Sequence, residues 1–340
     1  MAEALVIHAP HELQIETRPV PSLAQGEVLV RVEAGGICGS DLHYYHHGGF
    51  GAVRLKHPMI LGHEIAGRVA DKAPDVMGLE IGDLVAVNPG LPCQHCGQCL
   101  AGRSNHCTDM RFYGSAMRDP HIDGAFRRDL VCKARQCVRA EHKSPAELAL
   151  SEPFAVALHA VSRAGALMGK RVLVTGAGPI GALVALAARL NGACEVIVTD
   201  ILDEPLAVVR QLGADRVING RVAPQALAEL AGSIDVLIEC SGNAQALRGG
   251  LALMQPCGTI VQLGLGDDVT LPQSRIVTGE LTWTGSFRFK EEFALAVTLI
   301  DSGRADLSAL VTHRFALDQA SAAFDLASDR RQAMKILLEF

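Results

Sequence analysis

The densest group of residues with metal-binding chemistry is a run of cysteines in the pattern C-x2-C-x2-C-x7-C: Cys93, Cys96, Cys99 and Cys107. Four thiolates from one local loop can surround a single Zn²⁺ tetrahedrally, and such a closed shell leaves no position for water. The pattern therefore predicts a structural zinc site. A four-cysteine iron–sulfur cluster is the main alternative, because C-x2-C-x2-C also opens ferredoxin-type runs. His95 and His106 are expected at the surface.

A glycine-rich segment predicts a phosphate-binding turn. Gly176, Gly178 and Gly181 form a GxGxxG pattern between an apolar strand-like run and a helix expected over 179–191. These glycines allow the tight turn, the close approach of the pyrophosphate and the packing of helix on strand. The start of the helix, with Pro179 and Ile180, offers free N–H groups to the phosphates. A turn of this kind without a ligand is the alternative.

The end of the next strand predicts which nicotinamide cofactor is bound. Asp200 lies nineteen residues after Gly181, where a carboxylate accepts hydrogen bonds from the adenosine ribose. Its charge repels a 2′-phosphate, and the residues that follow, Ile201 and Leu202, bring no nearby Arg or Lys to bind one. The sequence therefore favours NAD over NADP.

Three dispersed residues form a second candidate metal site. Cys38 stands in GGICGSDLHYY, His63 in LGHEIAG and Glu152 in SEPFAVALHA. Taken singly, the cysteine is explained by core packing, the histidine by a structural role and the glutamate by the start of a helix. Taken together with a nucleotide site, sulfur, nitrogen and oxygen ligands predict an open zinc site that keeps one position for substrate.

The elements that position these residues differ along the chain. Residues 1–35 and 58–88 alternate polar and apolar side chains, which predicts short antiparallel strands, and 89–124 read as a long loop. From 171 onward, apolar runs alternate with helical segments, which indicates a parallel sheet covered on both faces. The segments EEFALAVTLIDSG and DQASAAFDLAS predict helices, and THRFAL and KILLEF predict strands.

Composition excludes several classes of partner. The chain has 340 residues, a net charge of −6 and 4% aromatic residues, and nothing in this composition suggests a nucleic-acid partner, whose binding surface is a basic patch or stripe. No basic, then apolar, leader opens the sequence. The uncharged stretch 172–188 is broken by glycines and a proline and is shorter than the roughly 20 residues of a spanning helix. We therefore expect a cytoplasmic protein with no membrane partner and with reduced cysteines.

The motifs together resemble a known family. GGICGSDLHYY, PMILGHEIAG, the cysteine loop, SEPFAVALHA and VLVTGAGPIG occur in this order, as in the medium-chain, zinc-containing dehydrogenases. The glutamate of SEP is similar to that of the polyol dehydrogenase branch. The resemblance implies an α/β fold with a Rossmann doubly wound parallel sheet over 151–287. It also implies a mainly β, GroES-like catalytic domain over 1–150 and 288–340, and dimers or tetramers with LTWTGSF near the subunit contact.

The resemblance also implies residue roles at the second metal site. Cys38 and His63 match zinc ligands, and Glu152 matches the third ligand, bound directly or through water. Glu64 matches an acidic neighbour that can approach or exchange at the metal. The candidates for contacting the substrate or moving its proton follow in one segment: Ser40 beside the reacting hydroxyl, His43 at the solvent end of the proton path, and Tyr44. Two zinc ions per chain are expected.

The resemblance further implies oxidation of a secondary hydroxyl. The segments TDMRFYGSAM and TGSFRF are similar to those of L-idonate-oxidising members, which implies a sugar acid as substrate and 5-keto-D-gluconate as product. Sorbitol, xylitol and, less favoured, threonine are alternative substrates. A non-catalytic, zinc-stabilised NAD-binding protein is the alternative from another class, and the complete set of site residues argues against it.

A sugar acid requires a cation for its carboxylate. Arg288 is the first candidate, because a planar guanidinium binds a carboxylate with two parallel hydrogen bonds. A surface ion pair is the alternative role for Arg288. Weaker candidates for the same contact are Lys56, His46, His57 and Arg111. The remaining cysteines receive no chemical role: Cys132, Cys137, Cys194, Cys240 and Cys257.

Overall fold

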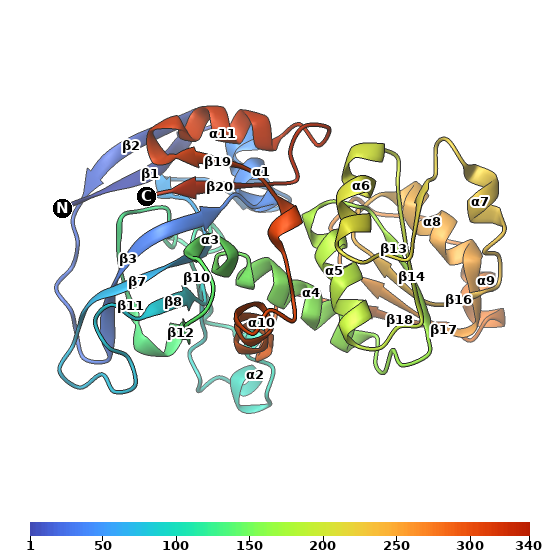
Figure 1. Ribbon diagram of the computed structural model, residues 1–340, viewed down its shortest axis with the longest axis horizontal. Coiled ribbons are helices and arrows are strands. Elements are labelled where there is room, and N and C mark those ends of the chain that lie inside the picture. The colour runs from blue at the N-terminus through green and yellow to red at the C-terminus, as the bar shows by residue number, and fades with distance from the viewer. The chain divides into compact units, whose positions relative to one another are not determined.

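The computed structural model describes residues 1–340, which divide into two compact units (Figure 1). Unit 1 comprises Met1–Glu152, Phe293–Asp329 and Lys335–Phe340, and unit 2 comprises Pro153–Glu292 and Arg330–Met334. The brief return of the chain to unit 2 at Arg330–Met334 has no signal in the sequence pattern. The functional division expected above, 1–150 with 288–340 against 151–287, stays a prediction.

Unit 2 is built on a six-stranded parallel sheet in the order β15-β14-β13-β16-β17-β18. The strands are β13 (Arg171–Thr175), β14 (Glu195–Asp200), β15 (Arg216–Asn219), β16 (Ile234–Glu239), β17 (Met254–Gln262) and β18 (Thr282–Gly285). The strand order reverses between β13 and β16, and ligands of such sheets bind at the carboxyl ends of the strands at this point. The expected Rossmann-type sheet is confirmed.

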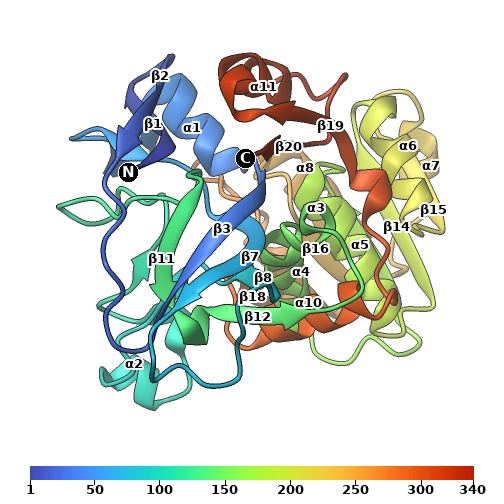
Figure 2. The ribbon, with the colours of Figure 1, turned by 60° about the vertical axis from the view of Figure 1, so that its left-hand side comes forward.

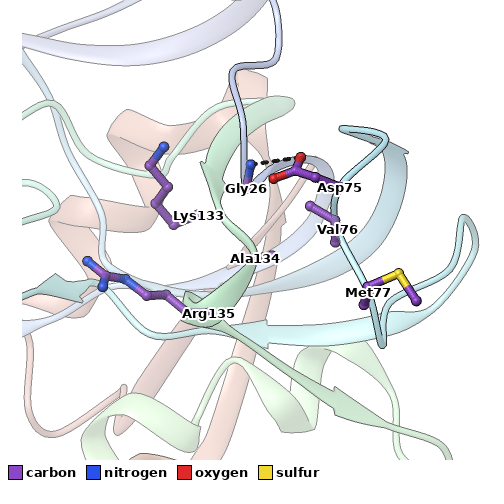
Figure 3. A pocket seen from close by; sticks show the side chains of 7 residues that line it. All are labelled: Gly26, Asp75, Val76, Met77, Lys133, Ala134 and Arg135. Atoms are coloured by element: carbon purple, nitrogen blue, oxygen red, sulfur yellow. Dashed lines mark hydrogen bonds between the residues drawn. The ribbon is translucent and has the colours of Figure 1, made fainter.

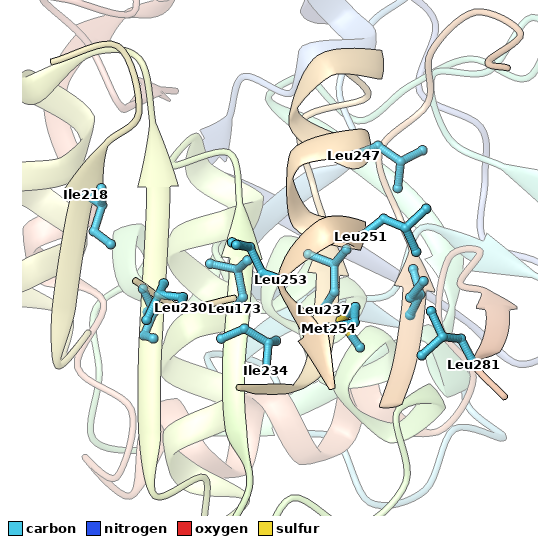
Figure 4. Packing of buried hydrophobic residues seen from close by; sticks show 12 residues of the cluster. Leu173, Ile218, Leu230, Ile234, Leu237, Leu247, Leu251, Leu253, Met254 and Leu281 are labelled. Atoms are coloured by element: carbon cyan, nitrogen blue, oxygen red, sulfur yellow. The ribbon is translucent and has the colours of Figure 1, made fainter. Parts of the chain in front are cut away.

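Helix α8 packs on this sheet through a leucine-rich face (Figure 4). Leu251 of α8 joins Leu173 of β13 and Leu237 of β16 in one buried cluster. The contact is close, because a Cβ atom added at Gly250 of α8 would lie 2.8 Å from Leu237 Cδ2. The helices are α4 (Ser151–Arg163, which begins in unit 1), α5 (Pro179–Leu190), α6 (Asp203–Gln211), α7 (Pro224–Ala228), α8 (Ala244–Leu253) and α9 (Gln273–Thr278).

Unit 1 contains a seven-stranded, mostly antiparallel sheet in the order β12-β8-β7-β3-β20-β19, with β11 also paired to β3 (Figure 2). Its strands are β3 (Glu27–Gly36), β7 (Glu64–Lys72), β8 (Leu84–Val87), β11 (Asp129–Lys133), β12 (Cys137–Ala140), β19 (Val311–Ala316) and β20 (Lys335–Glu339). A second sheet joins β1 (Ala2–Ala9), β2 (Glu12–Arg18) and β6 (Met59–Ile60). Two strand pairs are very short: β4 (Gly49–Phe50) with β5 (Val53–Arg54), and β9 (Gly90–Leu91) with β10 (Arg111–Phe112).

Short helices complete the described structure. The α-helices are α1 (Gly39–His47), α2 (Gly97–Leu100), α3 (Pro145–Leu148), α10 (Glu292–Asp301) and α11 (Ala320–Ala327). The 3₁₀ turns are η1 (Ser104–His106), η2 (Ala134–Gln136), η3 (Ser308–Leu310) and η4 (Leu317–Gln319). None of the helices combines the length and the apolar character that crossing a membrane requires.

Helix α1 is an element that the sequence pattern did not predict. It begins directly after Cys38, whose backbone N–H donates to Asp41 Oδ2 at 3.0 Å and so satisfies one of the donors at the helix start. It ends at Gly48, whose backbone is left-handed (φ 64°). The Gly48 N–H donates to the carbonyl oxygens of His43 and Tyr44 in the last turn. The polar loop expected over 89–124 also contains short elements, namely α2, η1 and the β9–β10 pair.

Candidate metal centre and nucleotide site

A thiol, an imidazole and a carboxylate meet in unit 1. The candidate ligand atoms of Cys38, His63 and Glu64 all lie within 4.8 Å of one another. Strand pairing explains their proximity, because Gly36 at the end of β3 is the direct partner of Glu64 at the start of β7. A Cβ atom at Gly36 would lie 2.2 Å from Glu64 Oε2, so only glycine leaves room for the carboxylate.

Asp41 ties the two ligand-bearing loops together. Its carboxylate accepts N–H bonds from Cys38 at 3.0 Å and from Gly62 at 3.3 Å. Its Oδ1 also lies 3.8 Å from His63 Nδ1, a buried atom that has no hydrogen-bond partner. Carboxylates behind metal-binding imidazoles fix the ring and its tautomer, so this arrangement suits a metal at Nε2 of His63. Sequence reasoning missed Asp41, although an acidic residue three positions after a helix N-cap is a recognisable signal.

Lys335 neutralises Glu64. The ammonium group donates to both carboxylate oxygens at 2.8 Å and to the Ile37 carbonyl at 2.9 Å. The side chains of Lys335 and Glu64 are only 3% and 1% exposed. Burial works against the charge, but the Glu64 carboxylate raises the pKa of Lys335, which therefore remains an ammonium ion. Sequence reasoning missed this residue.

Glu152 is an electrostatic neighbour of the same cluster. It lies buried in the first turn of α4, and burial raises the pKa of its carboxyl to about 8, against the opposing effect of His63. Burial and Glu64 likewise raise the pKa of the Cys38 thiol to about 12. Three acidic groups and an imidazole in one buried place match a divalent cation, which favours the ionised forms. Whether Glu152 or Glu64 provides the third ligand stays a prediction.

The other predicted catalytic residues lie on α1. Ser40 is half-buried and hydrogen-bonds the Cys38 thiol. His43 is exposed at the surface. Partial desolvation of its imidazole, together with the neighbouring His47, lowers its pKa. Tyr44 is only 2% exposed, and its hydroxyl accepts a hydrogen bond from the Ala116 N–H at 2.9 Å. The substrate and proton-transfer roles of these side chains stay predictions.

The four-cysteine loop brings its sulfur atoms together as the spacing predicts. All four Sγ atoms lie within 4.8 Å of one another. Backbone N–H groups point at the sulfurs, from Cys93 to Cys107 at 3.2 Å, from Cys96 to Cys93 at 3.3 Å and from Asp109 to Cys107 at 3.4 Å. Such donors stabilise thiolates, and they suit a tetrahedral zinc ion.

The surroundings of Cys96 and His95 also fit a metal site in the cysteine loop. N–H groups of Cys99 and Thr108 lower the pKa of the Cys96 thiol to about 5, which favours the thiolate that a metal requires. His95 Nδ1 bonds to the Cys93 carbonyl at 2.8 Å, which fits its expected place outside the ligand shell.

The glycine-rich turn has the form that the fingerprint requires. Gly176 is left-handed (φ 92°), and a Cβ atom there would lie 3.0 Å from Ser241. A Cβ atom at Gly181 would lie 1.8 Å from the Gly176 carbonyl oxygen, so α5 packs closely on the turn. A Cβ atom at Gly178 would have nothing within 4 Å, which leaves open space at the start of α5. Pro179 and Ile180 form the half-buried first turn of α5. This open space suits a pyrophosphate.

Asp200 ends β14 beside this turn, and one expectation about its surroundings is wrong. The carboxylate accepts N–H bonds from Ala177, Ile201 and Leu202. The expectation that no Arg or Lys lies near it fails, because Arg330 Nη2 donates to Asp200 Oδ2 at 2.6 Å. The cation comes from a segment that is distant in the sequence, where local reading does not find it.

Known protein families match segments of both units. Residues 24–142 match the family described as Alcohol dehydrogenase GroES-like domain, and residues 179–302 match Zinc-binding dehydrogenase. L-idonate 5-dehydrogenase (NAD(P)(+)) of Escherichia coli is 39% identical, covering 92% of this chain and 91% of the relative. Sorbitol dehydrogenase of Bos taurus is 36% identical, covering 99% and 95%.

A solved structure gives the same result. The crystal structure of L-idonate 5-dehydrogenase from Escherichia coli matches with a TM-score of 0.94 and 36% identity, covering 100% of this chain and 98% of that one. The chain belongs to the zinc-containing medium-chain alcohol dehydrogenase family, in its polyol dehydrogenase branch. It is an oxidoreductase that acts on CH–OH groups of a small polyol or sugar acid, with zinc and NAD(P).

The candidate carboxylate-binding residue of this dehydrogenase has an unusual backbone. Arg288 lies between β18 and α10 with a left-handed φ of 53°, and its Cζ lies 4.8 Å from the centre of the Phe287 ring. Non-glycine residues rarely adopt this conformation, and they concentrate at ligand-binding positions. The weaker candidates Lys56 and His57 both pair with Asp119 at 3.1 and 3.2 Å, and His46 bonds to Ser328 at 2.6 Å.

A surface pocket of about 460 Å³ lies apart from these residues (Figure 3). Its lining residues are Gly26, Asp75, Val76, Met77, Lys133, Ala134 and Arg135. The Gly26 N–H bonds to Asp75 Oδ1 at 3.1 Å across its wall. None of the predicted metal, cofactor or substrate residues lines the pocket, and no thiol or imidazole faces it, so we assign it no part in the reaction.

Proposed function

We propose that this dehydrogenase oxidises L-idonate at C5 to 5-keto-D-gluconate, with NAD as the favoured hydride acceptor. The observation that carries the proposal is the cluster of the half-buried Cys38 with the buried His63 and Glu64, whose ligand atoms lie within 4.8 Å of one another. The choice of substrate is supported by the Escherichia coli L-idonate 5-dehydrogenase, which is 39% identical.

The chain offers a ligand set for each expected group. Cys38 and His63, with Glu152 or Glu64, would hold the reactive zinc, and the four-cysteine loop would hold the structural one. Gly176, Gly178 and Gly181 would receive the pyrophosphate, with Asp200 at the ribose. When bound, zinc polarises the alcohol oxygen as a Lewis acid and the nicotinamide ring accepts the hydride.

The remaining steps fall to side chains of α1. The Ser40 hydroxyl takes the proton of the substrate alcohol as the first member of a relay. His43 then receives the proton and passes it to solvent. The lowered pKa of His43 keeps its imidazole neutral near pH 7, which is the form that accepts a proton. Asp41 orients His63 from behind, and Lys335 offsets the charge of Glu64.

A substrate panel tests this function. The zinc-loaded protein is incubated with NAD and with L-idonate, gluconate, sorbitol, xylitol or threonine, and NADH absorbance is followed at pH 8–9. We expect the highest kcat/KM with L-idonate. Equal or higher values with sorbitol or xylitol would replace the sugar acid by a neutral polyol, and no turnover with any substrate would favour a non-catalytic NAD-binding protein.

A sorbitol- or xylitol-type dehydrogenase is the second candidate, because bovine sorbitol dehydrogenase is 36% identical over 99% of this chain. Arg288 distinguishes the two. We propose that its guanidinium binds the substrate carboxylate, so Arg288→Leu raises the KM for L-idonate far more than the KM for sorbitol. Equal losses for both substrates would remove Arg288 from substrate recognition. The expected dimer or tetramer stays a prediction. Analytical ultracentrifugation would test it by measuring the mass of the assembly.

A further inference from the structure

The carboxylate of Asp200 has its hydrogen-bonding capacity filled. An ionised carboxylate has about four acceptor positions. Oδ1 takes the N–H groups of Ile201 at 2.7 Å and Leu202 at 3.2 Å, and Oδ2 takes the N–H of Ala177 at 2.7 Å. The fourth donor is Arg330 Nη2, at 2.6 Å from Oδ2. A ribose hydroxyl therefore finds an acceptor here only if one of these donors leaves.

Arg330 is the donor that can leave. The other three are backbone groups, held by the end of β14 and by the glycine-rich turn, whereas the Arg330 side chain is 49% exposed. The Asp200 side chain beneath it is 4% exposed, so Arg330 covers the carboxylate. The next residue, Arg331, is a second cation. Its Nη1 lies 3.4 Å from Glu204 Oε1 in the first turn of α6.

The covering guanidinium changes the charge that a cofactor meets. A bare Asp200 repels a ribose 2′-phosphate, but a paired Asp200 is neutralised. Arg330 uses one of its five N–H groups on the carboxylate, and a guanidinium is well suited to phosphate oxygens. The same side chain thus removes a repulsion and adds a binding group for a 2′-phosphate.

We propose that Arg330 is the cofactor-selecting residue of the nucleotide site, through which the site accepts a ribose 2′-phosphate as well as a 2′-hydroxyl. For NAD, Arg330 moves off Asp200 and the 2′-hydroxyl takes its place on the carboxylate. For NADP, Arg330 stays beside Asp200 and binds the phosphate. This inference rests on the nucleotide site of the proposed function.

The test measures binding of two nucleotides that lack the reactive ring. Titration calorimetry gives the Kd of 2′,5′-ADP and of 5′-AMP for the wild type and for Arg330→Gln. We expect the wild type to bind 2′,5′-ADP within about tenfold of 5′-AMP, and Arg330→Gln to weaken 2′,5′-ADP by about tenfold to a hundredfold. Binding of 5′-AMP stays unchanged or tightens, because the ribose no longer competes with a cation for Asp200.

Arg331→Gln is the matched control, because it removes the same charge one residue away. We expect it to change the ratio of the two Kd values by less than about threefold, as an exposed charge contributes little. An equal change in both variants would mean that net charge alone acts, and would overturn the proposal. A further measurement uses the wild type alone and so needs no folded variant. The proposal is also overturned if the wild type binds 2′,5′-ADP more than about a hundredfold more weakly than 5′-AMP.

Failure of this inference can be told from failure of the proposed function. If the wild type binds neither 5′-AMP nor NAD, the nucleotide site itself is wrong. If both bind and Arg330→Gln leaves the ratio of Kd values unchanged, the site stands and only the role of Arg330 is lost.

Discussion

The two candidate zinc sites of unit 1 are built in opposite ways. In the cysteine loop, all four ligands come from residues 93–107, and the charge of the thiolates is met by backbone N–H groups. In the reactive cluster, Cys38 and the pair His63 and Glu64 come from different segments, are held by Asp41, and are balanced by Lys335. Both groups bring their ligand atoms within 4.8 Å.

The difference separates a site that serves the fold from one that serves a reaction. A loop with little apolar surface gains its order from a closed ligand shell, so its metal contributes to folding. A reactive site must hold its ligands in place and still leave one position open, so the surrounding protein supplies the order and the counter-charge. The following substitutions test this contrast.

The largest effect is expected from the reactive cluster. His63→Ala removes a ligand of the open site, so kcat falls by about 10⁴-fold or more, while the unfolding temperature stays close to that of the wild type. Elemental analysis should find about one zinc per chain in place of about two. Normal kcat in this variant, or loss of both metal ions together, would contradict the separation of the two sites.

The cysteine loop should respond in the reverse sense. Cys99→Ser opens the closed shell and lowers the free energy of unfolding by about 4 kcal/mol, while kcat per folded molecule remains near that of the wild type. Cys194→Ser is the matched control, because Cys194 is exposed and its Sγ bonds only to the Gly169 carbonyl, which a hydroxyl can also do. A stable Cys99→Ser with impaired kcat would reverse the assignments.

Lys335 tests whether the reactive cluster depends on a buried counter-charge. Lys335→Met leaves Glu64 buried without its partner and lowers the free energy of unfolding by about 3 kcal/mol in denaturant titrations. Adding Glu64→Gln should restore most of the loss, because the uncompensated charge is gone. Lys290→Met, at an exposed position, is the control and should have little effect. No recovery in the double variant would show that packing, not charge, is responsible.

The smallest effect concerns a carboxylate of unit 2 that has an imidazole partner. Burial opposes ionisation of Glu292, but hydrogen bonds from His159 and from the Lys290 N–H lower the pKa of its carboxyl from 4.5 to about 2. A depressed pKa stabilises the fold above pH 4.5, and this contribution is lost as the pH falls to about 2. Glu292→Gln should therefore lose about 1 kcal/mol at pH 7 and nothing near pH 2.

Glu291→Gln is the matched control for that measurement, since Glu291 is the exposed neighbour on the same segment. The difference in unfolding free energy is followed by urea titration across the acid range. A difference between Glu292→Gln and the wild type that does not shrink below pH 4.5 would mean that the carboxylate is not the group that stabilises.

The features that the sequence predicted are those with local signals. The cysteine spacing and the strand–GxGxxG–helix context each lie within one short segment, and their geometry follows from the local backbone. The strands of unit 2 were equally readable, because parallel strands buried on both faces are runs of apolar residues. The two-residue strands β9 and β10 were not, since so short a segment has no periodicity.

The residues that the sequence did not reveal act across long separations. Arg330 lies 130 residues from Asp200, and Lys335 lies 271 residues from Glu64. Neither cation belongs to a motif, and each looks like an ordinary charged residue until the fold brings it to its carboxylate. Asp41 differs, because its place three residues after Cys38 is a local helix-capping signal.

The position of Lys335 has a consequence for protein synthesis. A ribosome delivers Glu64 271 residues before the lysine that offsets its charge, and β20 must then insert beside β3. Until that insertion, a nascent chain in which Cys38 and His63 have come together holds the Glu64 carboxylate without its Lys335 partner. The reactive cluster therefore gains its counter-charge only after residue 335 has been synthesised, whereas the ligand set of the cysteine loop is complete after residue 107.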